Sequence, residues 1–160
     1  MKSFVDTSGL ISLLHPDHEF NEKASTVLGR ANQEGTIIIN QIVYSELAAG
    51  VYFDNEEKLN SFLQDTGIRM ETPGNSVAYG AGSKFRSYIE NRGKKLQCPS
   101  CGNEDIFECN ECGGAITSRL HIPSDFLIGT HAEKEADQLI TFDGGFYSTY
   151  FDVEVVGIVN

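Results

Sequence analysis

With 160 residues, 40% of them hydrophobic, the chain is long enough for one domain with an ordinary core. No apolar run approaches the roughly 20 residues of a membrane span, and a strand-like segment starts almost at Met1, so we expect a cytoplasmic protein with no targeting peptide and no membrane partner. The formal net charge of −11 argues against a nucleic-acid partner unless the basic residues are gathered in one place.

Strand-like and helix-like segments alternate from the N-terminus onward. A short strand at residues 4–5 is followed by a helix over 8–14, and Asp17 can cap a second helix that reaches Gly35. The β-branched run 36–39 is typical of a strand buried on both faces. Helices are then predicted over 41–53, 54–66, 75–91 and 124–136, and strands over 68–71, 138–142 and 153–158. This order predicts an α/β fold with a mainly parallel central sheet and helices on both of its faces.

Two cysteine pairs interrupt this alternation, within about residues 96–120. Cys98 and Cys101 form one pair, Cys109 and Cys112 form the other, and the chain has no further cysteine. Each pair is followed at once by a glycine, which can adopt the left-handed backbone of a tight turn. Two short turns that present thiolates are what a tetrahedral zinc site requires. We therefore predict a small zinc ribbon with these four cysteines as its ligands.

The zinc in this insert is structural, because four cysteines close the coordination shell and leave no position for a reacting water. Disulfides are the alternative. They are disfavoured because no signal sequence indicates an oxidising compartment. The main domain then spans residues 1–160 with residues 96–120 inserted into it, and any catalysis has to come from outside the insert.

Four acidic residues are predicted to meet at one edge of the sheet. Asp6 and Asp143 each follow a strand, and ligands of open parallel sheets bind beyond the carboxyl ends of the strands. Glu46 and Asp125 lie on helices with apolar neighbours three and four residues away. A carboxylate on an apolar face is costly unless it is paired or binds metal. A cluster of such oxygens suits Mg²⁺ or Mn²⁺, which activates water for displacement at phosphorus.

Each of these acids also has an ordinary structural explanation. An aspartate in the first turn of a helix, such as Asp125, complements the helix dipole, and an aspartate after a strand often caps the next turn. Glu46 is harder to explain in this way, because no lysine or arginine lies within a helical turn of it. A metal site is favoured because four weak signals point to one edge of the sheet.

The segments around the acids resemble the four motif blocks of the PIN-domain nucleases, in the family's order. The blocks are Val5-Asp6-Thr7-Ser8-Gly9-Leu10-Ile11, Tyr44-Ser45-Glu46-Leu47-Ala48, Pro123-Ser124-Asp125-Phe126-Leu127-Ile128 and Thr141-Phe142-Asp143-Gly144-Gly145-Phe146. The likeness is greatest to the VapC toxins of prokaryotic toxin–antitoxin pairs, and it covers nearly the whole chain outside residues 96–120. It implies a PIN-like three-layer α/β/α fold, to which the zinc insert is an addition.

The resemblance also implies roles for single residues. Carried over position by position, it implies that an acidic tetrad holds Mg²⁺, made of Asp6, Glu46, Asp125 and Asp143. It also implies that Thr7, Ser8 or Thr141 orients the attacking water or a carboxylate. It implies a metal-dependent endoribonuclease that hydrolyses phosphodiester bonds of structured RNA, forms a homodimer and is covered by an antitoxin protein. Two positions depart from the family, since many relatives have a basic residue in place of Phe142 and a further acid near Gly145.

Two other functions stay open. Ribosome-biogenesis PIN endonucleases also combine this fold with a zinc ribbon, which makes rRNA processing the first alternative, although there the ribbon follows the domain. The second is a weakly catalytic PIN scaffold that binds RNA or protein through its ribbon, and the complete tetrad argues against it. A phosphotransfer receiver domain would need an adjacent acidic pair after the first strand and a lysine after a late one, and the sequence has neither.

Basic residues are gathered beside the zinc insert. Five of the twelve lysines and arginines lie within residues 84–95, whereas residues 98–118 contain four acidic residues and no basic one. RNA phosphates are therefore predicted to contact a basic flank of Arg86, Arg92, Lys94, Lys95 and Arg119. A solvated helix face explains residues 84–95 equally well.

Overall fold

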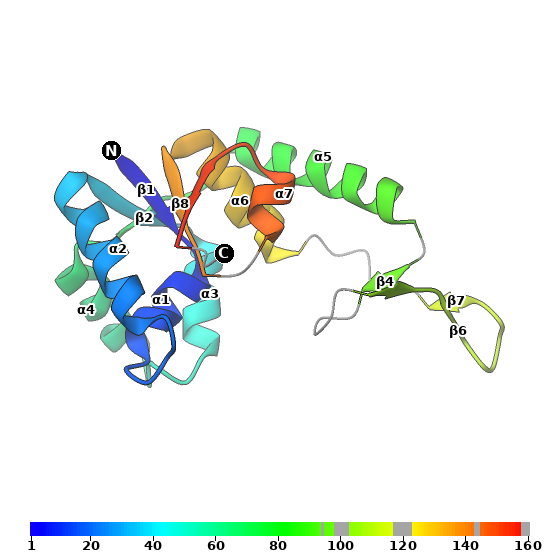
Figure 1. Cartoon of the computed structure of the whole chain (residues 1–160), viewed down its shortest axis with the longest axis horizontal. Helices are drawn as coiled ribbons and strands as arrows, with labels where there is room; N and C mark the ends of the chain where they lie inside the picture. The colour runs from blue at the N-terminus through cyan, green and yellow to red at the C-terminus, as the bar shows by residue number, and fades with distance from the viewer. Residues whose placement is uncertain (94, 98–102, 117–122, 143–144, 158–160) are drawn as a thin grey trace.

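The computed structural model describes residues 1–93, 95–97, 103–116, 123–142 and 145–157 (Figure 1). Its centre is a five-stranded sheet made of β1 (Lys2–Val5), β2 (Thr36–Ile39), β3 (Arg69–Met70), β8 (Gln138–Ile140) and β9 (Glu154–Val156). The strand order is β3-β2-β1-β8-β9, and every neighbouring pair is parallel. The predicted α/β class with a parallel central sheet is therefore confirmed.

Helices flank this sheet (Figure 1). They are α1 (Thr7–Leu14), α2 (Asn21–Glu34), α3 (Gln41–Ala49), α4 (Glu56–Thr66), α5 (Asn75–Arg92), α6 (Ser124–Glu135) and α7 (Phe146–Tyr150). Helix α2 packs against β2, whereas α6 packs against β1, β8 and α5. Among the helices that the structure describes, none is long and apolar enough to cross a membrane.

The start of α2 differs from the prediction that Asp17 caps this helix. The helix begins at Asn21, after a short turn in which Asp17 is exposed. The Asn21 side-chain amide donates to the carbonyl oxygens of Ser12 and Leu13 at 2.9 Å each and of His15 at 3.1 Å. These bonds satisfy carbonyl groups at the end of α1, which have no partner within the helix. Asn21 thereby fixes the corner between the two helices.

Several other helices and strands are also shorter than predicted. Helix α3 stops at Ala49, before Gly50, and α4 begins after Asn55, whose side-chain oxygen accepts the Lys58 N–H at 3.0 Å as an N-cap. The strands β3, β8 and β9 lose their predicted end residues. The sequence did not predict α7, a five-residue helix that follows Gly145.

The core lies on both faces of the central strands. Phe4 and Val5 of β1, Ile38 and Ile39 of β2 and Ile140 of β8 are completely buried, as the apolar run in β2 predicted. Helix α1 packs very closely on this core. A Cβ atom on Gly9 would lie 2.8 Å from the Val5 side chain, so only glycine lets α1 come so near to β1.

His131 is a titratable residue buried within this core. Its side chain on α6 is 1% exposed and meets the Phe4 ring edge-on at a centroid distance of 5.2 Å. Among the described residues its Nδ1 has no hydrogen-bond partner. Burial lowers the pKa of His131 below its usual value, the carboxylates of Glu135 and Glu71 act in the opposite direction, and the Lys2 ammonium adds to the lowering.

We expect His131 to make the protein less stable in mild acid. The unfolded chain takes up a proton here near pH ~6.5, whereas the folded chain does so only at lower pH. Between these two pKa values the unfolded state binds more protons than the folded state, so the free energy of unfolding rises with pH. The contribution of His131 to stability is fully present above the pKa of the unfolded state and is lost as the pH falls. Urea unfolding at pH 5.5 and 7.5 should show a smaller pH effect in His131→Leu than in the wild type or in the exposed control His15→Gln. Equal pH effects in all three proteins would contradict this assignment.

The described part of the insert forms two small antiparallel ribbons. β4 (Leu96–Gln97) pairs with β5 (Glu104–Asp105), and β6 (Phe107–Glu108) pairs with β7 (Ala115–Ile116). Figure 1 shows both ribbons beyond the C-terminal end of α5, away from the five-stranded sheet. The predicted boundary of this insert at residues 96–120 and its zinc-ribbon identity stay predictions.

Candidate functional site

Asp6 lies at the carboxyl end of β1 and is also the N-cap of α1. Its Oδ1 accepts hydrogen bonds at 2.9 Å from the Gly9 N–H and from the Ser8 hydroxyl, and its Oδ2 accepts the Thr141 hydroxyl at 2.7 Å. The carboxylate is 3% exposed. Ser8 and Gly9 follow β1, whereas Thr141 follows β8, so donors from the ends of two strands contact this carboxylate. Asp6 is therefore held in one orientation at the edge of the sheet.

Ser8 and Thr141 join the carboxyl ends of β1 and β8 around this carboxylate. Their hydroxyl oxygens are 3.1 Å apart, and Ser8 Oγ also accepts the N–H of Phe142 at 2.8 Å. The Phe142 ring stacks on Phe20 with centroids 5.5 Å apart. The fourth predicted acid, Asp143, lies outside the described residues.

Glu46 reaches the same edge from α3. Asn40 follows β2 directly, is fully buried, and starts this helix by accepting the N–H groups of Ile42 at 3.0 Å and Val43 at 3.1 Å. The carboxylate of Glu46 accepts a hydrogen bond from the hydroxyl of Thr7, which stands beside Asp6 in the chain. Thr7 therefore contacts an acid of the predicted tetrad, as the resemblance implied.

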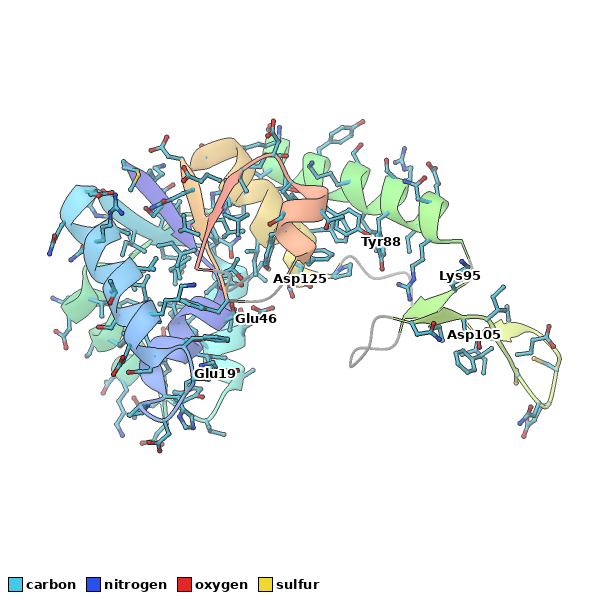
Figure 2. All side chains as sticks on the ribbon, viewed as in Figure 1. Glu19, Glu46, Tyr88, Lys95, Asp105 and Asp125 are labelled. Atoms are coloured by element: carbon cyan, nitrogen blue, oxygen red, sulfur yellow. The ribbon has the colours of Figure 1, made fainter. Side chains whose placement is uncertain are left out.

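Asp125 lies in the first turn of α6 and is joined to Tyr147 of α7. The Tyr147 hydroxyl donates to Asp125 Oδ1 at 3.4 Å, and the tyrosine is 1% exposed. Burial raises the pKa of Tyr147 far above its usual value, and the nearby carboxylates of Asp6, Asp125 and Glu46 raise it further by opposing a phenolate charge. One phenol is thus influenced by all three described acids. Figure 2 shows Glu46 and Asp125 on the same side of the molecule, extending from α3 and α6, which pack together.

These acids do not form a ready-made metal cage. Among the residues that the structure describes, no three histidine, cysteine, aspartate or glutamate side chains are placed so that they could hold an ion. Hydroxyl groups contact the carboxylates instead, Thr7 on Glu46 and Tyr147 on Asp125. The donor set of carboxylates and hydroxyls still fits a hard cation such as Mg²⁺ or Mn²⁺. Binding of a cation by the tetrad stays a prediction.

Tyr147 is the site residue that the sequence did not reveal. Its signal was an aromatic pair, Phe146-Tyr147, directly after two glycines in the sequence. Such a pair is more often part of the core, and α7 is too short to show a helical period. Only the fold shows that this tyrosine approaches the carboxylates.

The second cysteine pair has the backbone of a metal-binding turn. The Cys109 N–H donates to the carbonyl of Gly114, and the Gly113 N–H donates to the carbonyl of Cys109, both at 2.8 Å. Gly113 has a left-handed φ of 68°. Hydrogen bonds from the backbone N–H groups of Glu111 and Cys112, and from the Cys112 thiol, lower the pKa of Cys109. They favour the thiolate, which is the form that binds zinc.

The first cysteine pair, Cys98 and Cys101, lies outside the described residues. Cys109 and Cys112 are both free thiols, so they do not form a disulfide with each other. Zinc binding by the four cysteines stays a prediction, for which the turn at the second pair is suitable.

The predicted basic flank is described only in part. Arg86 is exposed on α5, and Lys95 is exposed just after it. The Arg92 guanidinium lies over the Tyr88 ring at 5.5 Å, donates to the Tyr88 hydroxyl at 2.9 Å, and donates from Nε to the Lys95 carbonyl at 2.7 Å. Two members of the flank lie outside the described residues: Lys94 and Arg119.

No protein-family model matches the chain, and no curated protein matches it. Solved structures share its fold. A chain of VapBC2 from Rickettsia felis, bound to a promoter DNA fragment, is 20% identical with a TM-score of 0.61 over 97% of both chains. A chain of DNA-bound VapBC from Salmonella typhimurium is 14% identical with a TM-score of 0.58, over 97% of this chain and 96% of that one. At these identities the likeness shows the fold alone, and it confirms the predicted PIN-like fold class.

Proposed function

We propose that this protein is a Mg²⁺- or Mn²⁺-dependent endoribonuclease that hydrolyses RNA phosphodiester bonds, as a VapC-like toxin of a toxin–antitoxin pair. One observation carries the proposal. The buried hydroxyl of Tyr147 donates to Asp125, and the charges of Asp6, Asp125 and Glu46 all raise its pKa, at the edge of a parallel sheet where ligands bind. The fold shared with two VapBC complexes supports the toxin assignment.

In this proposal each residue has a separate task. The cation is held by Asp6, Glu46, Asp125 and Asp143. When bound, the cation activates water and neutralises charge at the phosphate. Ser8 and Thr141 keep Asp6 oriented, and Thr7 does the same for Glu46. Tyr147 stays protonated, because its pKa is raised, and it serves as a hydrogen-bond donor that positions Asp125.

Partners are part of the same proposal. The neighbouring structures are complexes of VapB with VapC, and we propose an antitoxin that covers the acids of this chain too, together with a homodimer. RNA phosphates contact the basic flank rather than the acidic insert, because like charges repel. The four cysteines hold a structural zinc and take no part in the chemistry.

The test is cleavage of structured RNA by the purified wild-type protein. We expect endonucleolytic cuts with Mg²⁺ or Mn²⁺, no cuts with excess EDTA, and recovery of activity when the cation is restored. Gel mapping of end-labelled RNA distinguishes internal cuts from trimming. Cleavage that is unchanged by EDTA, or no cleavage with either cation, would overturn the proposal.

A further inference from the structure

A cavity lies between α5, α6 and α7. It has a volume of about 290 Å³ and none of the carboxylates described above lines it. Its wall includes Ser87, Tyr88 and Asn91 of α5, Phe126 of α6, and Thr149 and Tyr150 of α7. The cavity therefore combines aromatic rings with small polar side chains.

Three rings form the aromatic part of the wall. Tyr88 and Tyr150 stand perpendicular to each other, at 89° with centroids 5.5 Å apart. Tyr88 also contacts Phe126 at 5.4 Å, and Phe126 lies 6.2 Å from Tyr150. Tyr150 remains 39% exposed, which is unusual for a large ring in such a cluster. The two tyrosines form a corner in which a flat ligand can contact one ring face and one ring edge.

The polar groups of the wall have free capacity for a ligand. The Ser87 hydroxyl donates to the Ser83 carbonyl at 3.3 Å, and the Thr149 hydroxyl donates to the Gly145 carbonyl at 2.7 Å. Each oxygen can still accept a hydrogen bond. The Asn91 amide offers both donors and an acceptor. Such a set can contact the edge of a nucleobase.

Two cations lie near the aromatic wall. Lys84 lines the cavity and is neutralised by an ion pair with Glu133 at 3.0 Å. Arg92 lies over the Tyr88 ring, and within the described part of the chain no carboxylate is paired with it. The positive charge of Arg92 is therefore available to an anionic group of a ligand.

Two elements contribute both to the cavity and to the candidate metal site. Phe126 of its wall follows Asp125 in the chain, and α7 provides Tyr147 to the acids and Tyr150 to the cavity. Figure 2 shows Tyr88 next to α7, between Asp125 and Lys95. The cavity and the described acids are thus close together in the fold, because α6 and α7 contribute to both.

We propose that this cavity binds one unpaired nucleobase of the RNA, next to the phosphate that is cleaved. The base stacks in the corner of Tyr88 and Tyr150, its edge contacts Asn91 and the hydroxyls, and Arg92 contacts a neighbouring phosphate. A base paired in a duplex cannot enter, so cleavage occurs beside a single-stranded nucleotide. This inference rests on the proposed ribonuclease function and adds a requirement for its substrate.

Binding of short oligoribonucleotides without added Mg²⁺ or Mn²⁺, and with no chelator that would also remove the zinc, tests the cavity. One oligonucleotide carries the fluorescent base 2-aminopurine, and the other has an abasic site at the same position. We expect Tyr88→Leu to weaken binding of the 2-aminopurine oligonucleotide about tenfold, because this change removes a stacking ring. Tyr88→Phe keeps the ring and should bind this oligonucleotide like the wild type. Ser87→Phe, an exposed position that should not disturb folding, should fill the cavity and weaken binding equally. The abasic oligonucleotide should bind all variants alike.

Two variants on the same helix serve as matched controls. Tyr79→Leu removes a tyrosine that is 79% exposed and outside the cavity, and Ser76→Phe adds a ring at an exposed serine there. Both should bind like the wild type. If the two cavity variants also bind like these controls while the wild type cleaves RNA, the nucleobase cavity is wrong and the nuclease stands. If the wild type prefers the base-containing RNA but cleaves nothing with Mg²⁺ or Mn²⁺, the nuclease is wrong and the cavity stands.

Discussion

Neutralising any one of Asp6, Glu46, Asp125 or Asp143 is expected to abolish cation-dependent RNA cleavage. Each substitution, Asp→Asn or Glu→Gln, keeps the shape of the side chain and removes one negative charge that the cation requires. We expect rate losses of about 10²- to 10³-fold or more, in the range found when one electrostatic contact to a reacting centre is removed. End-labelled RNA and single-turnover conditions measure this effect directly. The matched control is Asp65→Asn, at an exposed position on α4, which should cleave normally.

The same variants should lose activity but gain stability in the metal-free state. Asp6, Glu46 and Asp125 all act on the buried Tyr147 phenol, and like charges repel each other in the absence of a cation, so removing one charge is expected to stabilise the metal-free protein. Added Mg²⁺ should raise the melting temperature of the wild type more than that of the variants, because it binds only the folded state. If Asp125→Asn keeps full cleavage and the full Mg²⁺-dependent rise, Asp125 only complements the dipole of α6, and the four-acid site is wrong.

The fold could be predicted because its strongest signals are local. The apolar run of β2 identifies a strand buried on both faces, and alternation of strands with helices identifies a parallel sheet. The ends of elements could not be predicted as well, because they depend on single side-chain contacts made after folding. Asp17 is a suitable cap by residue type, but Asn21 bonds to three carbonyl groups of α1 and sets the start of α2 instead.

Part of the candidate site was predictable for the same topological reason. Residues that follow parallel strands meet at one edge, which places Asp6 next to Thr141 and brings its neighbour Thr7 into contact with Glu46 on the helix after β2. The partners of long side chains were not predictable. Arg92 was assigned to RNA by charge alone, and its contact with Tyr88 was not foreseen, because that contact depends on how α5 ends. Tyr147 was missed because its role requires the exact placement of the short helix α7.

The insert is expected to depend on zinc for its order. Its larger apolar side chains are about half exposed, with Ile106 at 53%, Phe107 at 51% and Ile116 at 46%. Each of its described strands has only two residues. A segment whose described large apolar side chains stay half exposed gains too little from burial to offset the entropy of ordering its backbone, so a metal has to supply the stability. The main domain has its own core around β1 and β2 and should not need the zinc.

Protein purified without chelator should therefore contain one zinc per chain, measured by elemental analysis. After chelation, or in Cys109→Ser, limited proteolysis should cut within residues 98–118, while the far-ultraviolet circular dichroism and the melting transition of the main domain change little. Asn110→Ala, in the same turn as Cys109 but without a metal ligand, should keep the zinc and resist the protease. Absence of zinc, or disulfides between the cysteines, would contradict the four-cysteine site. Cooperative unfolding of the whole chain on chelation would instead show that the insert and the main domain fold as one unit.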